Sequence, residues 1–158
     1  MAKLEVTVPE NSLSVLGIVT IQAPLEKVFE AYVNEDLFKQ WWAQGNPLTI
    51  HTFDAVDGGK WHVSDFDEER GESEFIGYFH EVARNERIVQ TFEFLGMPER
   101  GHVAIEKAEF VKIDDGTTQI NTCTTFQNMD DRDGMIGSGM EDGWRKSIEA
   151  LGALIEKE

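Results

Sequence analysis

The spacing of apolar residues changes twice along the chain, and each change marks a different kind of element. The β-branched run from Val15 to Ile21 predicts a strand. Residues 22–47 follow a helical spacing, whereas apolar and polar positions largely alternate between residues 48 and 126, with turn-forming residues at regular intervals. This alternation predicts about five or six further strands. Residues 129–158 return to a helical spacing.

Two short helices are predicted between the first strand and those that follow. Pro24 suits the first turn of the first helix, whose apolar side chains recur three or four residues apart: Leu25, Val28, Phe29 and Tyr32. Asn34 is a favourable N-cap for the second helix, which the sequence Gly-Asn-Pro at residues 45–47 ends.

Residues 129–158 predict one long helix that contains several glycines. Its apolar face consists of six side chains: Ile136, Met140, Trp144, Ile148, Leu151 and Ile155. Gly137, Gly139 and Gly143 interrupt the helix, and each costs about 1 kcal/mol relative to alanine in a helix interior. Glycines leave the helix surface free of side chains. Such a surface is useful where a sheet approaches the helix closely or where a ligand lies beside it. The sequence leaves both explanations open.

Two hairpins set the expected facing of the strands. Asp57 and Gly58 predict a type I′ turn that places Asp54 opposite Trp61, and in this register four apolar side chains share an inward face: Leu48, Ile50, Trp61 and Val63. A bulge would reverse the assignment.

The final hairpin, around residues 114–116, leaves neither face of its strands cleanly apolar. Lys107 and Glu109 interrupt one face, and Glu106 interrupts the other. Either a polar group lies inside a cavity, where it would hold a ligand head group, or a bulge mixes the two faces.

This order of elements favours an α+β fold. We expect a curved antiparallel sheet of six or seven strands that grips one long C-terminal helix, with two short helices after the first strand. A curved sheet that meets a helix only along a stripe can leave a cavity between them. The ten Phe and four Trp residues suit either a packed core or the lining of such a cavity.

The charge of the chain excludes several classes of partner. It has 30 acidic and 14 basic residues and a formal net charge of −16. This charge repels polyphosphates and anionic lipids, so neither nucleic-acid binding nor a membrane role is expected. The single cysteine excludes an internal disulfide framework. The N-terminus lacks the apolar core of a signal peptide, and no apolar run approaches the ~20 residues of a membrane span, so we expect a cytoplasmic monomer or homodimer.

Six segments, taken in their order, resemble the START-like superfamily, which is also called SRPBCC or helix-grip. The segments are residues 23–29 (APLEKVF), 38–42 (FKQWW), 58–61 (GGKW), 87–94 (RIVQTFEF), 131–135 (DRDGM) and 138–144 (SGMEDGW). The last two segments are similar to the branch named after activators of the heat-shock protein 90 ATPase. The resemblance covers residues 13–158 as one helix-grip domain and leaves residues 1–12 as an N-terminal extension or edge strand.

The resemblance implies a deep apolar cavity between the sheet and the long helix, but it does not imply one activity. Members of the superfamily include lipid and sterol carriers, polyketide cyclases and the chaperone-linked group. We expect the ligand-binding residues to be aromatic, apolar or glycine positions of the strands and of the final helix: Phe38, Trp41, Trp42, Ile50, Trp61, Val63, Phe75, Phe79, Phe92, Phe94, Met135, Gly139, Met140, Gly143 and Trp144.

Adjacent helical residues point about 100° apart, so Trp41 and Trp42 cannot both face the core. One ring is expected in the core and the other near the cavity mouth or on the surface. Residues 65–74 (DFDEERGESE) are interpreted as a solvated hairpin tip.

The sequence predicts no catalytic residues, no cofactor and no metal site. His51 and His62 lie diagonally on one strand face in the register above, but spacing fixes no third ligand, and neither HxxxH nor CxxC occurs. No Ser-His-Asp, Cys-His or paired-carboxylate arrangement stands out.

Three functions follow, in order of preference. The first is non-enzymatic binding of an apolar or amphipathic small molecule. The second is a chaperone-associated stress-response role, which the branch name suggests. The third is an enzyme of the cyclase or isomerase type, which would need an acid–base group beside the bound substrate.

Overall fold

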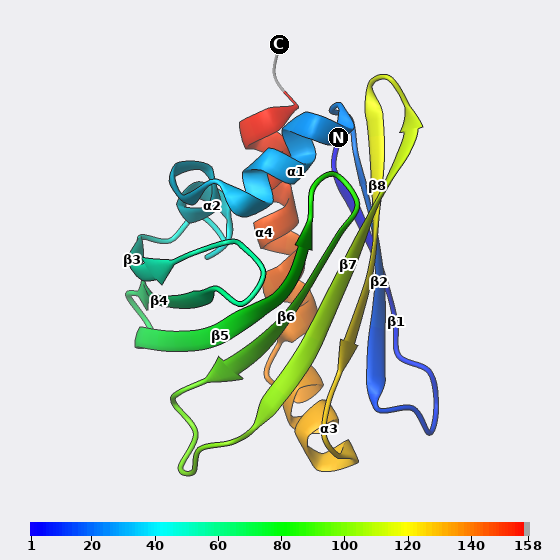
Figure 1. Cartoon of the computed structure of the whole chain (residues 1–158). Coiled ribbons are helices and arrows are strands. Elements are labelled where there is room, and N and C mark those ends of the chain that lie inside the picture. Colours follow the sequence, from blue (N-terminus) through cyan, green and yellow to red (C-terminus); the bar gives the residue numbers. More distant parts are fainter. Residues whose placement is uncertain (157–158) are drawn as a thin grey trace.

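The computed structural model describes residues 1–156 and consists of one antiparallel sheet and four helices (Figure 1). The strands are β1 (Lys3–Thr7), β2 (Ser14–Ile21), β3 (Leu48–Phe53), β4 (Lys60–Asp67), β5 (Gly71–Ala83), β6 (Arg87–Phe94), β7 (Val103–Asp114) and β8 (Thr117–Thr125). The helices are α1 (Leu25–Val33), α2 (Glu35–Trp41), α3 (Met129–Gly137) and α4 (Met140–Ile155). The α+β class is therefore confirmed.

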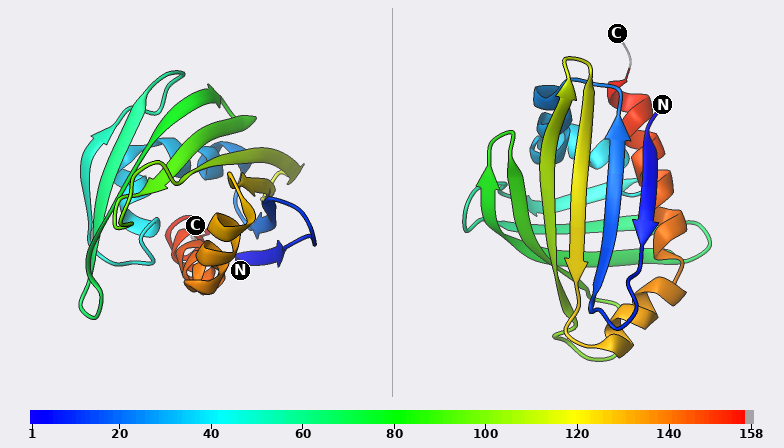
Figure 2. Two further views of the ribbon diagram at one scale, coloured as in Figure 1. Left: turned by 90° about the horizontal axis from the view of Figure 1, so that it is seen from below. Right: turned by 90° about the vertical axis from the view of Figure 1, so that its right-hand side faces the viewer.

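The sheet curves around α4. Its strands follow the order β1-β2-β8-β7-β6-β5-β4-β3, and all neighbours are antiparallel. Seen from below, α3 and α4 lie on the concave side, while α1 and α2 cover one end of the sheet (Figure 2). No helix within residues 1–156 is both long and apolar enough to span a membrane.

The sheet has eight strands rather than the six or seven predicted. The additional strand is β1, which pairs with β2 at the edge of the sheet. It lies within residues 1–12, for which the sequence leaves an N-terminal extension and an edge strand as alternatives.

The two short helices form where the sequence predicts them. The Asn34 side chain caps α2 by accepting a hydrogen bond from the Leu37 amide over 3.1 Å. Trp41, in the last turn of α2, donates its indole N–H to the Ala31 carbonyl over 2.9 Å. This bond fixes α2 against α1 and satisfies a buried donor.

The prediction of one long C-terminal helix is wrong, because the helix breaks between α3 and α4. Gly139 has a φ of +88°, a left-handed conformation that side chains disfavour, and it forms the N-cap of α4. Gly139, which is unfavourable inside a continuous helix, therefore lies at the point where the helix is interrupted. Residues 157 and 158, which the predicted helix included, lie outside the described residues.

The register of the first hairpin differs from the prediction by a bulge. Gly58 has a φ of +80° but Asp57 does not adopt a positive φ, so the loop is not a type I′ turn. A shift in register between Ile50 and Thr52 places Phe53, instead of Asp54, opposite Trp61. Trp61 is 2% exposed and faces inward as expected.

A second bulge, between Lys112 and Asp114, sets the facing of the last hairpin. Glu106 pairs with Thr124 and Ala108 pairs with Thr122, so these residues share the concave face. Lys107 pairs with Cys123 on the opposite face.

Candidate functional site

A cavity of about 350 Å³ lies between the concave face of the sheet and the helices α2, α3 and α4. This volume is within the usual range of small-molecule sites. Strands β3 to β8 all contribute to its wall. Exposed Arg70, Ser138 and Gly139 are part of the lining, so the cavity meets solvent on the side of the β4–β5 hairpin and the α3–α4 junction.

Most of the predicted ligand-binding residues lie around this cavity. They are Phe38, Trp41, Trp42, Trp61, Phe75, Phe79, Phe92, Met135, Gly139, Met140, Gly143 and Trp144. Three others do not line it: Val63 is fully buried in the core, Ile50 packs against the same core, and Phe94 packs at a tilt against Phe75 with ring centroids 5.3 Å apart.

Aromatic side chains form the wall near α2. The Trp42 ring stacks on Phe38 with centroids 5.7 Å apart and meets Phe75 edge-on at 5.3 Å and Trp61 at 6.0 Å. Trp41 is 3% exposed, as expected for the tryptophan in the core, but both tryptophans contribute to the cavity wall. Such rings offer a large apolar surface with little conformational freedom to lose on binding.

A carboxyl group interrupts the apolar wall on β7. Gln90 of β6 donates a hydrogen bond from Nε2 to Glu106 Oε1 over 3.1 Å. Burial raises the pKa of Glu106 from its usual 4.5 to about 7, against the opposing effect of the Gln90 bond. Burial, and next the charge of Glu106, also raise the pKa of Tyr32, which lines the same cavity.

A second carboxyl group lies nearer the mouth. Asp65 is 7% exposed and lines the cavity, so it does not belong to a solvated hairpin tip. Burial raises the pKa of Asp65, the guanidinium of Arg70 opposes this shift, and Asp67 adds to it. Among residues 1–156, neither Asp65 Oδ1 nor the Trp61 indole nitrogen has a hydrogen-bond partner, although both atoms are buried.

Neither Gly139 nor Gly143 lies close to the sheet. A side-chain carbon added at Gly139 would meet open space, and one added at Gly143 would lie 2.6 Å from Nε2 of Gln44. The close approach between sheet and helix occurs instead at Gly17 of β2, where an added carbon would clash with the Trp144 ring. Gly139 and Gly143 therefore form part of the cavity wall.

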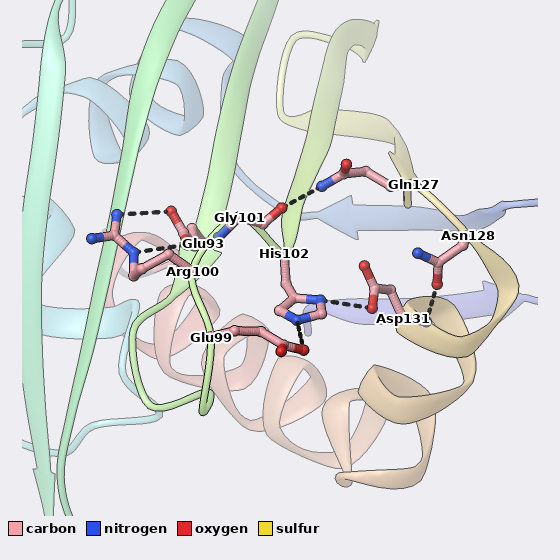
Figure 3. A network of polar contacts seen from close by, with 8 residues as sticks. All are labelled: Glu93, Glu99, Arg100, Gly101, His102, Gln127, Asn128 and Asp131. Carbon is pink, nitrogen blue, oxygen red and sulfur yellow. Dashed lines mark hydrogen bonds and ion pairs between the residues drawn. The ribbon is translucent and has the colours of Figure 1, made fainter.

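A polar network ties the start of α3 to the β6–β7 loop (Figure 3). His102 contacts Asp131 through Nδ1 over 2.9 Å and Glu99 through Nε2 over 3.1 Å. Glu99, and next Asp131, raise the pKa of His102. The Gln127 side chain donates to the Gly101 carbonyl over 2.6 Å, so the first turn of α3 and the segment before it are tied to the β6–β7 loop.

The sequence predicts only a part of the polar cavity wall. A polar group inside the cavity is one of its two explanations for the interrupted face that carries Glu106, whereas Gln90 and Asp65 give no signal that distinguishes them from solvated side chains. Only the interrupted apolar face at Glu106 indicates a polar group in the cavity. The bulge near Lys112 explains why the sequence does not assign the face on which Glu106 lies.

Comparisons with known proteins identify relatives of this chain. A family model described as Activator of Hsp90 ATPase homolog 1-like protein matches residues 22–156. A search of curated proteins finds no match.

Solved structures share the fold at low sequence identity. Protein Ms6760 from Mycobacterium smegmatis has a TM-score of 0.85 and 16% identity over 95% of this chain and 94% of its own. A protein from Arthrobacter aurescens has a TM-score of 0.87 and 18% identity over 98% and 92%. DynU16, from the dynemicin biosynthetic locus, has a TM-score of 0.67 and 18% identity over 90% of this chain and 46% of its own.

Proposed function

Since the chain belongs to the family of Activator of Hsp90 ATPase homolog 1-like proteins, within the START-like helix-grip superfamily, we propose that it binds an amphipathic small molecule between the sheet and α4. The observation that carries this proposal is the composition of the cavity wall. Aromatic and other apolar side chains form most of the lining, and polar side chains lie among them. This combination is typical of small-molecule sites.

The polar groups indicate the chemistry of the ligand head. Glu106 accepts hydrogen bonds when ionised, and buried Asp65 Oδ1 has no partner within the described residues. A buried acceptor without a partner costs about 1–3 kcal/mol, which a donating ligand would recover. We therefore propose that the ligand head donates hydrogen bonds, as an alcohol or an amine does, and that the apolar part of the ligand lies against Trp42 and Phe75.

The proposal is tested by calorimetry with three ligands of equal chain length: decylamine, decanol and decanoate. At pH 8 the Glu106 carboxyl, with a pKa of about 7, is mostly ionised. We expect saturable one-to-one binding of decylamine and decanol and weaker binding of decanoate, because the carboxylate is repelled by Glu106. Native mass spectrometry of the purified protein adds an independent search for a retained ligand.

Glu106→Gln should reduce the preference for decylamine over decanoate at least several-fold. Glu109→Gln is the matched control, since Glu109 lies on the same strand but faces outward beside Lys107. No binding of any of the three ligands, or identical preferences in the two variants, would count against the proposal.

A second candidate function is acid–base catalysis by Glu106. A carboxyl with a pKa of about 7 suits proton transfer near neutral pH, and Glu106 reaches a cavity that could hold a substrate. If the bound compound is transformed, mass spectrometry detects a product that Glu106→Gln abolishes without abolishing binding. Unchanged ligand after prolonged incubation would argue against this function.

The chaperone-associated role stays a prediction that rests on the family description. It is tested by a pull-down with a heat-shock protein 90 homologue, followed by an ATPase measurement. Absence of both association and stimulation would remove it.

A further inference from the structure

Three side chains of types that commonly bind metal ions lie together on the outer face of the sheet, away from the cavity. They are His51 of β3, His62 of β4 and Glu74 of β5, and their ligand atoms all lie within 4.8 Å of one another. The two imidazole rings are 4.4 Å apart between centroids, and His62 Nε2 contacts Glu74 Oε2 at 2.5 Å.

The fold itself places the three groups together. Ile50 pairs with Val63 and Thr52 pairs with His62, so His51 is the additional residue of the bulge, which brings its side chain beside that of His62. Glu74 pairs with Ser64, two residues from His62 along β4, and Ser64 Oγ is 2.8 Å from His51 Nε2. The sequence indicates the pair of His51 and His62, but the third residue of the cluster, Glu74, comes from another strand.

We propose that His51, His62 and Glu74 bind a divalent transition-metal ion, with zinc as the preferred ion. Two imidazoles and one carboxylate form a common three-ligand zinc set, in which a water molecule completes the tetrahedron. The His62–Glu74 contact must lengthen on binding, because two ligands about 2.0–2.2 Å from one tetrahedral ion lie more than ~3 Å apart. Both side chains retain exposed surface, of 26% and 44%, so they can move and an ion can reach them.

The site is independent of the proposed cavity ligand. Side chains alternate between the two faces of a strand, so His62 and Glu74 lie opposite the face that carries Trp61 and Phe75. The formal net charge of −16 also favours the approach of a cation. A bound ion would link β3, β4 and β5 and would stabilise the folded chain as a ligand.

The test is calorimetric titration of the untagged full chain with zinc chloride. We expect one ion per chain, and at least tenfold weaker binding in each of His51→Ala, His62→Ala and Glu74→Gln. His80→Ala is the matched control, because His80 is an exposed histidine of β5 outside the cluster. Its affinity for zinc should equal that of the wild type.

A second measurement separates loss of the site from loss of the fold. Zinc should raise the melting temperature of the wild type and of His80→Ala but not of the three site variants. Since His51 is exposed, His51→Ala should retain the far-ultraviolet circular dichroism spectrum and the decylamine binding of the wild type. The proposal is overturned if zinc does not bind, or if the site variants and the control bind it equally.

Discussion

The two helices of the C-terminal segment, α3 and α4, differ in their surroundings. In the second half of α4, Ile148, Leu151 and Ile155 are at most 3% exposed and belong to the main core. In α3 no residue is buried, and Ile136 is 36% exposed. The predicted apolar face therefore holds along α4, where Met140 and Trp144 line the cavity, but not in α3, where Ile136 is exposed and does not line it.

The two parts of the C-terminal segment therefore have different roles. The second half of α4 stabilises the domain by packing against β1, α1 and α2. The half that includes α3, Gly139 and the first turn of α4 forms the wall and mouth of the cavity. The following predictions test this division.

The largest expected contrast is between Leu151→Ala and Met135→Ala. Leu151 is fully buried, so its truncation should lower the free energy of unfolding by about 2–5 kcal/mol. Met135 is half-buried at the cavity wall, and its truncation should cost less than about 1 kcal/mol. Chemical denaturation measures both values, and equal losses would show that α3 is part of the packed core.

Glu106→Gln should stabilise the protein in a pH-dependent manner. The folded-state pKa is raised from 4.5 to about 7, so the native protein favours the neutral acid. The associated stability is fully present below pH 4.5 and is lost as the pH rises through about 7. One pKa unit corresponds to about 1.4 kcal/mol, so at pH 8 the variant should exceed the wild type by about 3 kcal/mol.

At pH 4 the Glu106→Gln variant and the wild type should have nearly equal free energies of unfolding. Glu109→Gln controls for the loss of one surface charge. A stability difference that does not depend on pH would contradict burial of Glu106 beside the cavity.

Substitution by alanine should change stability in opposite directions at Gly137 and Gly139. A Cβ atom added at either position would have no other atom within 4 Å, so the difference comes from the backbone conformation. Gly139 has a φ of +88°, so Gly139→Ala should cost about 1–2 kcal/mol. Gly137 ends α3 in a helical conformation, so Gly137→Ala should stabilise by up to about 1 kcal/mol. Thermal melts measure both effects, and a stabilising Gly139→Ala would indicate a continuous helix in solution.

The smallest expected effect concerns the contact between α3 and the β6–β7 loop. Glu99, and next Asp131, raise the pKa of His102 in the folded protein. The contribution of the protonated imidazole to folding stability is therefore fully present below the ordinary pKa of about 6.5, and it is lost as the pH rises through the raised pKa. Hydrogen exchange at pH 6 should show less protection of α3 amides in His102→Gln than in the wild type. This difference should shrink at higher pH, and a difference that grows with pH would contradict the ion pairs.

Much of the architecture followed from the sequence, because local signals and long-range packing agree there. Asn34 caps α2 as predicted, and the predicted strand from Val15 to Ile21 lies within β2. The family resemblance is confirmed by the match over residues 22–156.

The errors arise where one residue changes the register or interrupts an element. The bulges near His51 and Lys112 depend on contacts between strands, which apolar spacing does not encode. Gly139 could be recognised as unfavourable in a helix, but its left-handed conformation could not be inferred. The sequence predicts most of the aromatic cavity wall and leaves Glu106 inside the cavity as one of two alternatives, whereas Asp65 looks like an ordinary surface acid until the fold places it.

The central claim is that the segment around α3 borders a ligand cavity that Glu106 makes selective. A crystal structure of the protein with decylamine at pH 8 tests it most directly. We predict density for one alkyl chain against Trp42 and Phe75, with its nitrogen within hydrogen-bond distance of Glu106. Side chains that fill the cavity, or decylamine found only on the outer surface, would contradict the account.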